Sequence, residues 1–109
     1  MGPRKWCVAG MPSVGGIADG VGTAATFVGP SGIASDGAGT FYVVDGYAIR
    51  KIDIASATVS TIIGSFGQVG VSTGALPATL NTPVAVTVLP TGEIAIVDSI
   101  ENAVLIGHL

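Results

Sequence analysis

The sequence predicts an all-β fold built from two copies of one repeat, and three observations support this prediction. Short apolar runs rich in β-branched residues are separated by Gly, Pro, Asp and Ser, which is the pattern of strands and turns. No stretch has a convincing helical period. Three landmarks recur 53 residues apart, namely a proline, a turn glycine and an aspartate at a strand end: Pro30 and Pro83, Gly39 and Gly92, Asp45 and Asp98. A repeat of this length is typical of modular proteins whose units stack on one another.

The first repeat contributes four predicted strands. Ser31–Ser35 ends at a glycine-rich turn, where glycine supplies the positive φ that a tight turn requires. Phe41–Val44 is a continuous apolar run that ends at Asp45. Two further β-branched runs, Ala48–Ile54 and Val59–Ile63, complete a four-stranded unit.

The second repeat contributes three predicted strands, Val84–Leu89, Ile94–Val97 and Ala103–Gly107. Another predicted strand, Arg4–Ala9, precedes the first repeat. Its apolar residues and the glycine that follows match Thr61-Ile62-Ile63-Gly64, with 54 residues between the two glycines. We therefore expect a single two-repeat unit over residues 1–109, with an outer strand at 4–9, a first sheet at 31–64 and three strands of a second sheet at 84–109.

The repeat resembles the NHL-repeat family of β-propellers. The resemblance rests on Gly29-Pro30-Ser31-Gly32-Ile33-Ala34-Ser35-Asp36, on Gly39-Thr40-Phe41-Tyr42-Val43-Val44-Asp45 and on Ile49-Arg50-Lys51-Ile52. It is looser in the second repeat, where Thr87 and Leu89 replace a small residue and an aspartate. The resemblance implies that each repeat is one four-stranded propeller blade, with its first strand along a central channel, in a ring that commonly has six blades.

Two blades cannot close a ring, so each would leave one apolar face in water. Self-association would cover these faces. We expect residues 4–9 of one chain to pair with Ala103–Gly107 of its neighbour, giving a homotrimer that forms one six-bladed propeller by strand exchange. The predicted subunit-interface residues are Trp6, Cys7, Val8, Val104, Leu105 and Ile106.

Composition excludes several partner classes. Charged residues make up 10% of the chain and the net charge is −3, and the four basic residues fall into two pairs, so no surface for nucleic acid is expected. No apolar run reaches the roughly 18 residues of a membrane span, and no cleaved signal peptide is expected. The single cysteine, Cys7, excludes an internal disulfide and is expected to be a small buried hydrophobe.

The residues that carry chemistry suggest no catalytic, cofactor or metal site. His108 is the only histidine and is expected at the rim. Asp45 and Asp98 are expected to accept hydrogen bonds from turn N–H groups; a calcium site made by repeated acids is the alternative. The glycine-rich segment 15–22 lacks the ending of a nucleotide-binding loop and is expected to be a flexible loop between blades. Tyr47 is the best candidate for a ligand contact.

Three functions stay open, in order of preference. The first is a non-enzymatic, oligomeric propeller scaffold for protein–protein or small-ligand binding. The second is a structural propeller fragment, natural or engineered, with no ligand of its own. The third is a metal-dependent lyase or hydrolase, which related propellers build with several histidines, whereas this chain has one.

Overall fold

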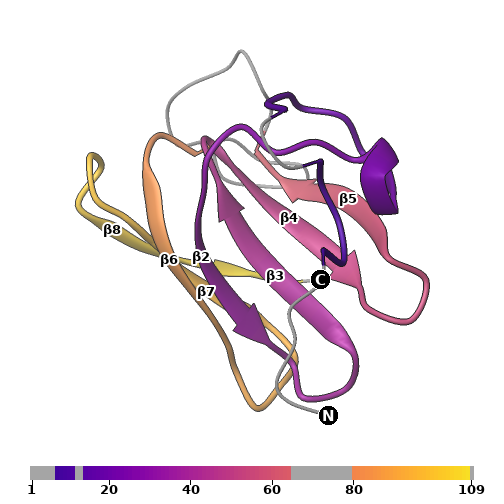
Figure 1. Ribbon diagram of the computed structural model, residues 1–109. Helices are drawn as coiled ribbons and strands as arrows, with labels where there is room; N and C mark the ends of the chain where they lie inside the picture. Colours follow the sequence, from indigo (N-terminus) through magenta and orange to yellow (C-terminus); the bar gives the residue numbers. More distant parts are fainter. Residues whose placement is uncertain (1–6, 12–13, 65–79, 109) are drawn as a thin grey trace, which may run out of the picture.

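The fold was examined in a computed structural model that describes residues 7–11, 14–64 and 80–108 (Figure 1). The elements are β1 (Gly20–Val21), the 3-10 turn η1 (Gly22–Ala24), β2 (Pro30–Ser35), β3 (Thr40–Asp45), β4 (Ala48–Asp53), β5 (Thr58–Ile63), β6 (Pro83–Val88), β7 (Ile94–Asp98) and β8 (Ala103–Gly107). The all-β prediction is thus confirmed for the described residues.

The strands form two antiparallel sheets. One has the order β1-β5-β4-β3-β2 and the other has the order β6-β7-β8; we call them blade 1 and blade 2. The repeat holds at the level of register, because Pro30 pairs with Asp45 and Pro83 with Asp98. In both blades an irregularity follows the proline, between residues 30 and 32 and between residues 83 and 85. The two blades are therefore built on the same local plan.

The two blades pack face to face, and their first strands β2 and β6 lie side by side. We call the two facing sides the inner faces and the two opposite sides the outer faces. The inner faces share one core of seven buried residues: Tyr42, Val44, Ile49, Ile63, Leu80, Ile94 and Ile96. On this side β3 contributes the apolar side chains of Tyr42 and Val44, and β7 contributes those of Ile94 and Ile96, which is why the sheets bury it.

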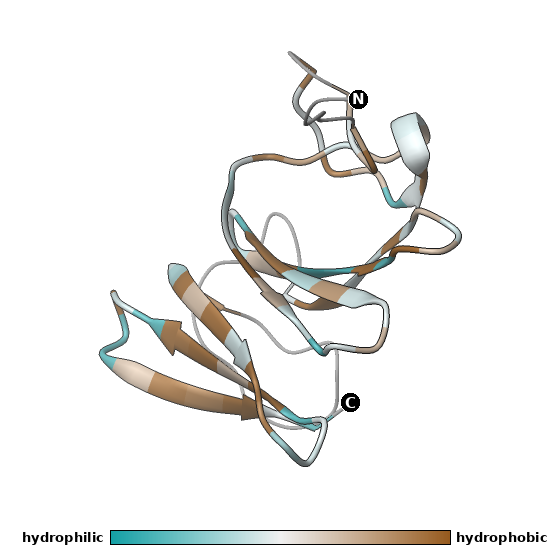
Figure 2. Ribbon diagram, turned by 60° about the horizontal axis from the view of Figure 1, so that its bottom comes forward, coloured by the Kyte–Doolittle hydropathy of each residue, from teal (hydrophilic) through white to brown (hydrophobic). Residues whose placement is uncertain are grey.

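The outer face of blade 1 carries a second, smaller cluster. Ala25, Val43, Ile52 and Val59 are buried there, and Val8, Ala9, Phe27 and Phe41 pack against them. Four of these eight residues come from the segment before β2, which crosses the outer face of blade 1 (Figure 2). Blade 1 is thus covered by blade 2 on one side and in part by its own N-terminal segment on the other.

The predicted strand order within each repeat is confirmed, with ends that differ by at most one residue. The segment 15–22 is not simply a loop, because Gly20 and Val21 pair with Val59 and Thr58 and add β1 to the edge of blade 1. The many glycines of this segment argued against a strand, since glycine is depleted in strands.

The predicted strand Arg4–Ala9 lies partly outside the described residues, and Cys7, Val8 and Ala9 form no strand within the single chain. A strand requires a neighbouring strand to accept its hydrogen bonds, and none of the described strands pairs with these residues. Pairing with a second chain stays a prediction. The expectation that Cys7 is buried is wrong for the single chain: its thiol is exposed and contacts the carbonyl oxygens of Ala9 and Gly10.

Candidate functional site

A fully buried aspartate closes the second strand of each described blade. Asp45 accepts hydrogen bonds from the backbone N–H groups of Val28 and Gly29, at 2.9 and 2.7 Å. Asp98 accepts the corresponding bonds from Asn81 and Thr82, at 2.8 and 3.1 Å. The predicted structural role of both carboxylates is confirmed, but most of their donors precede the first strand of the blade instead of following the aspartate. Each aspartate therefore fixes how the chain enters its blade.

In blade 1 the buried carboxylate has a cationic partner. Arg50 of β4 is fully buried and donates to Asp45 Oδ2 at 2.7 Å, and also to Asp19 Oδ1 at 3.1 Å. Its guanidinium binds the carbonyl oxygens of Thr26 and Ala18, both at 2.9 Å, and its Cζ lies 4.9 Å from the centre of the Phe27 ring. Arg50 thus joins the segment 18–27 to the sheet.

In the sequence Arg50 belongs to a basic pair and to the repeat motif Ile49-Arg50-Lys51-Ile52, and neither was expected to place it in a buried ion pair. Two signals pointed to burial. Arg50 alternates with Ala48 and Ile52 along β4, and all three are buried. Asp19 and Asp45 each supply a carboxylate to Arg50, but Asp19 lies far from Arg50 in the sequence.

The outer face of blade 2 is apolar and open. Ala85, Val97 and Val104 form one cross-strand row on this side, and Ile106 extends it. Val97 is 41% exposed, Val104 70% and Ile106 49%. Leu105 points the other way and packs against the shared core. Of the predicted interface residues in β8, the structure therefore places the side chains of Val104 and Ile106, but not that of Leu105, on the open side.

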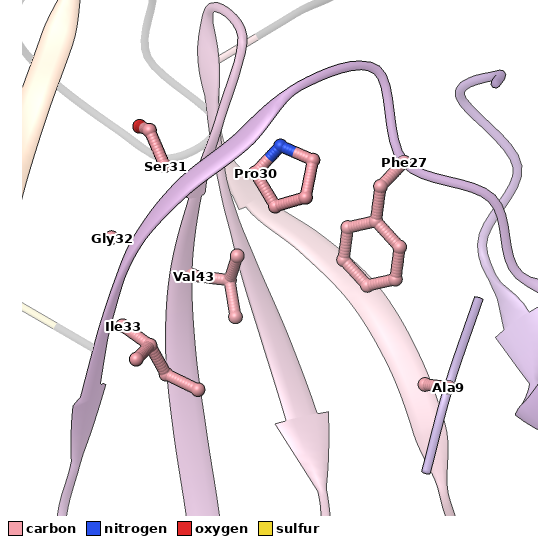
Figure 3. A pocket seen from close by; sticks show the side chains of 7 residues that line it. All are labelled: Ala9, Phe27, Pro30, Ser31, Gly32, Ile33 and Val43. Carbon is pink, nitrogen blue, oxygen red and sulfur yellow. The ribbon is translucent and has the colours of Figure 1, made fainter. Parts of the chain in front are cut away.

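The outer face of blade 1 holds a groove of about 400 Å³. Its lining residues are Ala9, Phe27, Pro30, Ser31, Gly32, Ile33 and Val43. In Figure 3 the side chains of Phe27, Pro30 and Val43 gather at the centre, and Ala9 lies across from them on the N-terminal segment. Ile33 is 60% exposed, which is unusual for a side chain of its size on a strand. The groove is the part of this face that the N-terminal segment leaves uncovered.

The remaining predicted site residues do not converge. Tyr47 lies in the turn between β3 and β4 and is exposed, as a ligand contact would require, but it does not line the groove on the outer face of blade 1. His108 is 80% exposed and pairs with Glu93 at the surface of the chain, as expected for a surface or rim histidine. Val8 is half-buried against blade 1. Trp6 lies outside the described residues.

Among the described residues, no group of three or more His, Cys, Asp or Glu side chains is placed to hold a metal ion. In the same part of the chain, no helix has the length and hydropathy needed to cross a membrane. Asp36, in the turn after β2, accepts hydrogen bonds from the N–H groups of Ala38 and Thr40, which hold the pKa of its carboxyl below 3.8.

Comparisons with known proteins identify the repeat. A family model described as the teneurin NHL domain matches residues 7–106. A solved protein of unknown function from Bacteroides thetaiotaomicron is 32% identical with a TM-score of 0.82, over 92% of this chain and 26% of its own. An auxiliary nutrient binding protein from the same organism is 22% identical with a TM-score of 0.76, over 94% of this chain and 29% of its own. No curated protein matches. This chain therefore spans less than a third of the length of either solved structure.

Proposed function

This chain belongs to the family of teneurin NHL domains, and from that premise we propose that it is a non-enzymatic β-propeller scaffold for binding, assembled from several copies of a two-blade subunit. Three copies would supply the six blades of a closed ring. In this arrangement residues 4–9 of one copy add a fourth strand to β8 of its neighbour, and the binding surface belongs to the ring as a whole.

The proposal rests on two apolar faces that are not fully covered in the single chain. One presents exposed side chains and the other presents a groove. The outer face of blade 2 presents exposed valines, and the outer face of blade 1 presents a groove lined by Phe27 and Ile33. Exposed apolar patches of this kind mark interaction surfaces, because leaving them in water costs free energy in proportion to their area. Association of copies removes both faces from water at once.

The open edge of β8 supports the strand exchange. Blade 1 has β4, β5 and β1 outside its second strand, whereas blade 2 has only β8 among the described residues. The outer edge of β8 therefore presents backbone N–H and C=O groups that a further strand can pair with.

A binding role is supported more weakly than assembly. NHL domains are generally binding or scaffold domains. The solved neighbour that binds nutrients is only 22% identical, so it supports the shared fold and leaves the ligand of this chain open.

Native mass spectrometry and sedimentation equilibrium of the 109-residue chain test the assembly. We expect three chains per particle; a stable single chain at every concentration would overturn it. A screen of glycans and peptides against the assembled particle then tests the binding role. A particle that binds no member of either class would favour a structural fragment with no ligand of its own.

A further inference from the structure

We infer that the groove on the outer face of blade 1 receives Val97 and Val104 from the outer face of blade 2 of a second copy. This inference rests on the proposed self-association and specifies which surfaces meet and in what register. Its basis is that the same interface already exists once inside the chain, between the inner faces of blades 1 and 2.

The cross-strand row of blade 2 that would enter the groove matches the row of blade 1 that packs into the shared core. Within blade 1, Gly32 pairs with Val44 and Val44 with Ile49. Within blade 2, Ala85 pairs with Val97 and Val97 with Val104. The strand pairing makes Val97 the equivalent of Val44, and Val104 the equivalent of Ile49. Val44 and Ile49 are fully buried against blade 2, whereas Val97 and Val104 are exposed.

The groove matches the surface of blade 2 that receives Val44 and Ile49. Its residues Phe27, Ile33 and Val43 correspond, 53 residues later, to Leu80, Val86 and Ile96; Leu80 and Ile96 belong to the shared core and Val86 packs against it. Leu80 and Ile96 are each 1% exposed because blade 1 covers them. The groove is thus the surface of blade 1 that corresponds to the covered surface of blade 2. The difference is that no side chains of a preceding blade pack into it.

The N-terminal segment occupies the position that a fourth strand takes in the internal interface. Ile63 of β5 belongs to the shared core, and its counterpart 54 residues earlier, Ala9, lines the groove. The glycines that follow agree, since Gly10 has a φ of +86° and Gly64 a φ of +91°. The receiving copy therefore supplies one wall of the groove itself, and the same copy would donate its N-terminal strand to β8 of the inserted blade.

The two rows differ at two positions: Val104 is smaller than Ile49, and Ala85 is larger than Gly32 but fits the space available. Ala85 stands where blade 1 has Gly32, so the interface between copies must hold one more Cβ. A Cβ placed on Gly32 would lie 3.6 Å from the carbonyl oxygen of Val84, which is ordinary contact. Ala85 can therefore approach the corresponding carbonyl of a second copy, that of Ser31, without a clash.

Charge substitutions test the register. In sedimentation equilibrium, we expect Val97→Asp, Val104→Asp and Ile33→Asp each to weaken association by about 100-fold or more, because each would bury an unpaired carboxylate. All three side chains are exposed in the single chain, so its circular dichroism should not change. Ile100→Asp is the matched control, because Ile100 is as exposed but lies in the turn between β7 and β8; its association should equal that of the wild type.

The double variant Val97→Asp with Ile33→Lys should regain association relative to either single variant, because the two charges would face each other. Variants at residues 33, 97 and 104 that associate as tightly as the wild type would overturn this inference while leaving the proposed self-association intact. A wild-type chain that stays single would overturn both.

Discussion

Blades 1 and 2 hold the same buried aspartate at the same strand end, but among the described residues only blade 1 pairs it with an arginine. Arg50 lies in β4 and binds Asp45, whereas Leu105 takes the equivalent place in β8 and packs into the shared core. Asp98 is nevertheless as buried as Asp45. Backbone N–H groups hold both carboxylates, so the aspartate alone is enough to fix the entry into a blade.

In blade 1, Arg50 does more than neutralise Asp45. In blade 1 the guanidinium also binds Asp19 and two carbonyl oxygens of the segment before β2, so it holds that segment against the outer face. In blade 2 an apolar side chain at this place lets the sheet pack directly against blade 1. One position in the repeat thus either attaches a segment of chain or completes an interface between blades.

The largest expected effect comes from replacing Arg50 of blade 1 with leucine, the residue at the equivalent position of blade 2. Arg50→Leu would leave Asp45 buried without its cation, and we expect the free energy of unfolding to fall by about 3–5 kcal/mol. Urea denaturation measures this change. The double variant Arg50→Leu with Asp45→Asn should recover part of the loss, because it removes the unpaired charge; if the single and double variants were equally stable, the ion pair would not be the cause.

A smaller effect is expected at the aspartate that has no arginine. Asp98→Asn keeps the shape of the side chain but removes the charge that strengthens the bonds from Asn81 and Thr82. We expect it to lower the free energy of unfolding by about 1–3 kcal/mol in the same assay. Asp45→Asn should cost more, because it also weakens the contact with Arg50. Equal losses at the two sites would contradict the comparison.

The smallest effect concerns the turn after the first strand, where blade 1 has Asp36 and blade 2 has Leu89. Because folding lowers the pKa of Asp36 below 3.8, its stabilising contribution is present above that value and is lost as the pH falls through the folded pKa. Asp36→Asn should remove this part of the acid sensitivity. Carboxyl NMR titration, combined with unfolding at a series of acidic pH values, checks it; a pKa at or above 3.8 for Asp36 in the folded protein would contradict it.

Much of the fold could be predicted from the sequence because the landmarks of the repeat are local sequence signals. Strand ends, turn glycines and the aspartates Asp45 and Asp98 recur at a fixed spacing, and each has a local physical reason. The pairing of β1 could not be predicted in this way, since a two-residue strand of Gly20 and Val21 has no pattern of its own. It forms only because β5 offers an edge beside it.

The candidate surfaces were predicted only in part for the same reason. The expected strand exchange assigned Val104, Leu105 and Ile106 to an interface together, because strand pairing does not say which side of the sheet blade 1 covers; Leu105 packs against the shared core. The groove depends on Phe27, Val43 and Ala9, which are far apart in sequence and meet through tertiary packing. Arg50 is hidden by the same effect, because its partners lie on three separate segments.

If the two outer faces of the chain are the two halves of one interface, a cross-linker should join them between chains. Ile33→Cys and Val97→Cys are combined in a Cys7→Ser chain and treated with a short bismaleimide. Because the two positions lie on opposite outer faces of one chain, we predict covalent products that contain several chains and end at three. Ile33→Cys with Ile100→Cys is the control and should give none. Assembled particles in which residues 33 and 97 never become linked between chains would contradict the account.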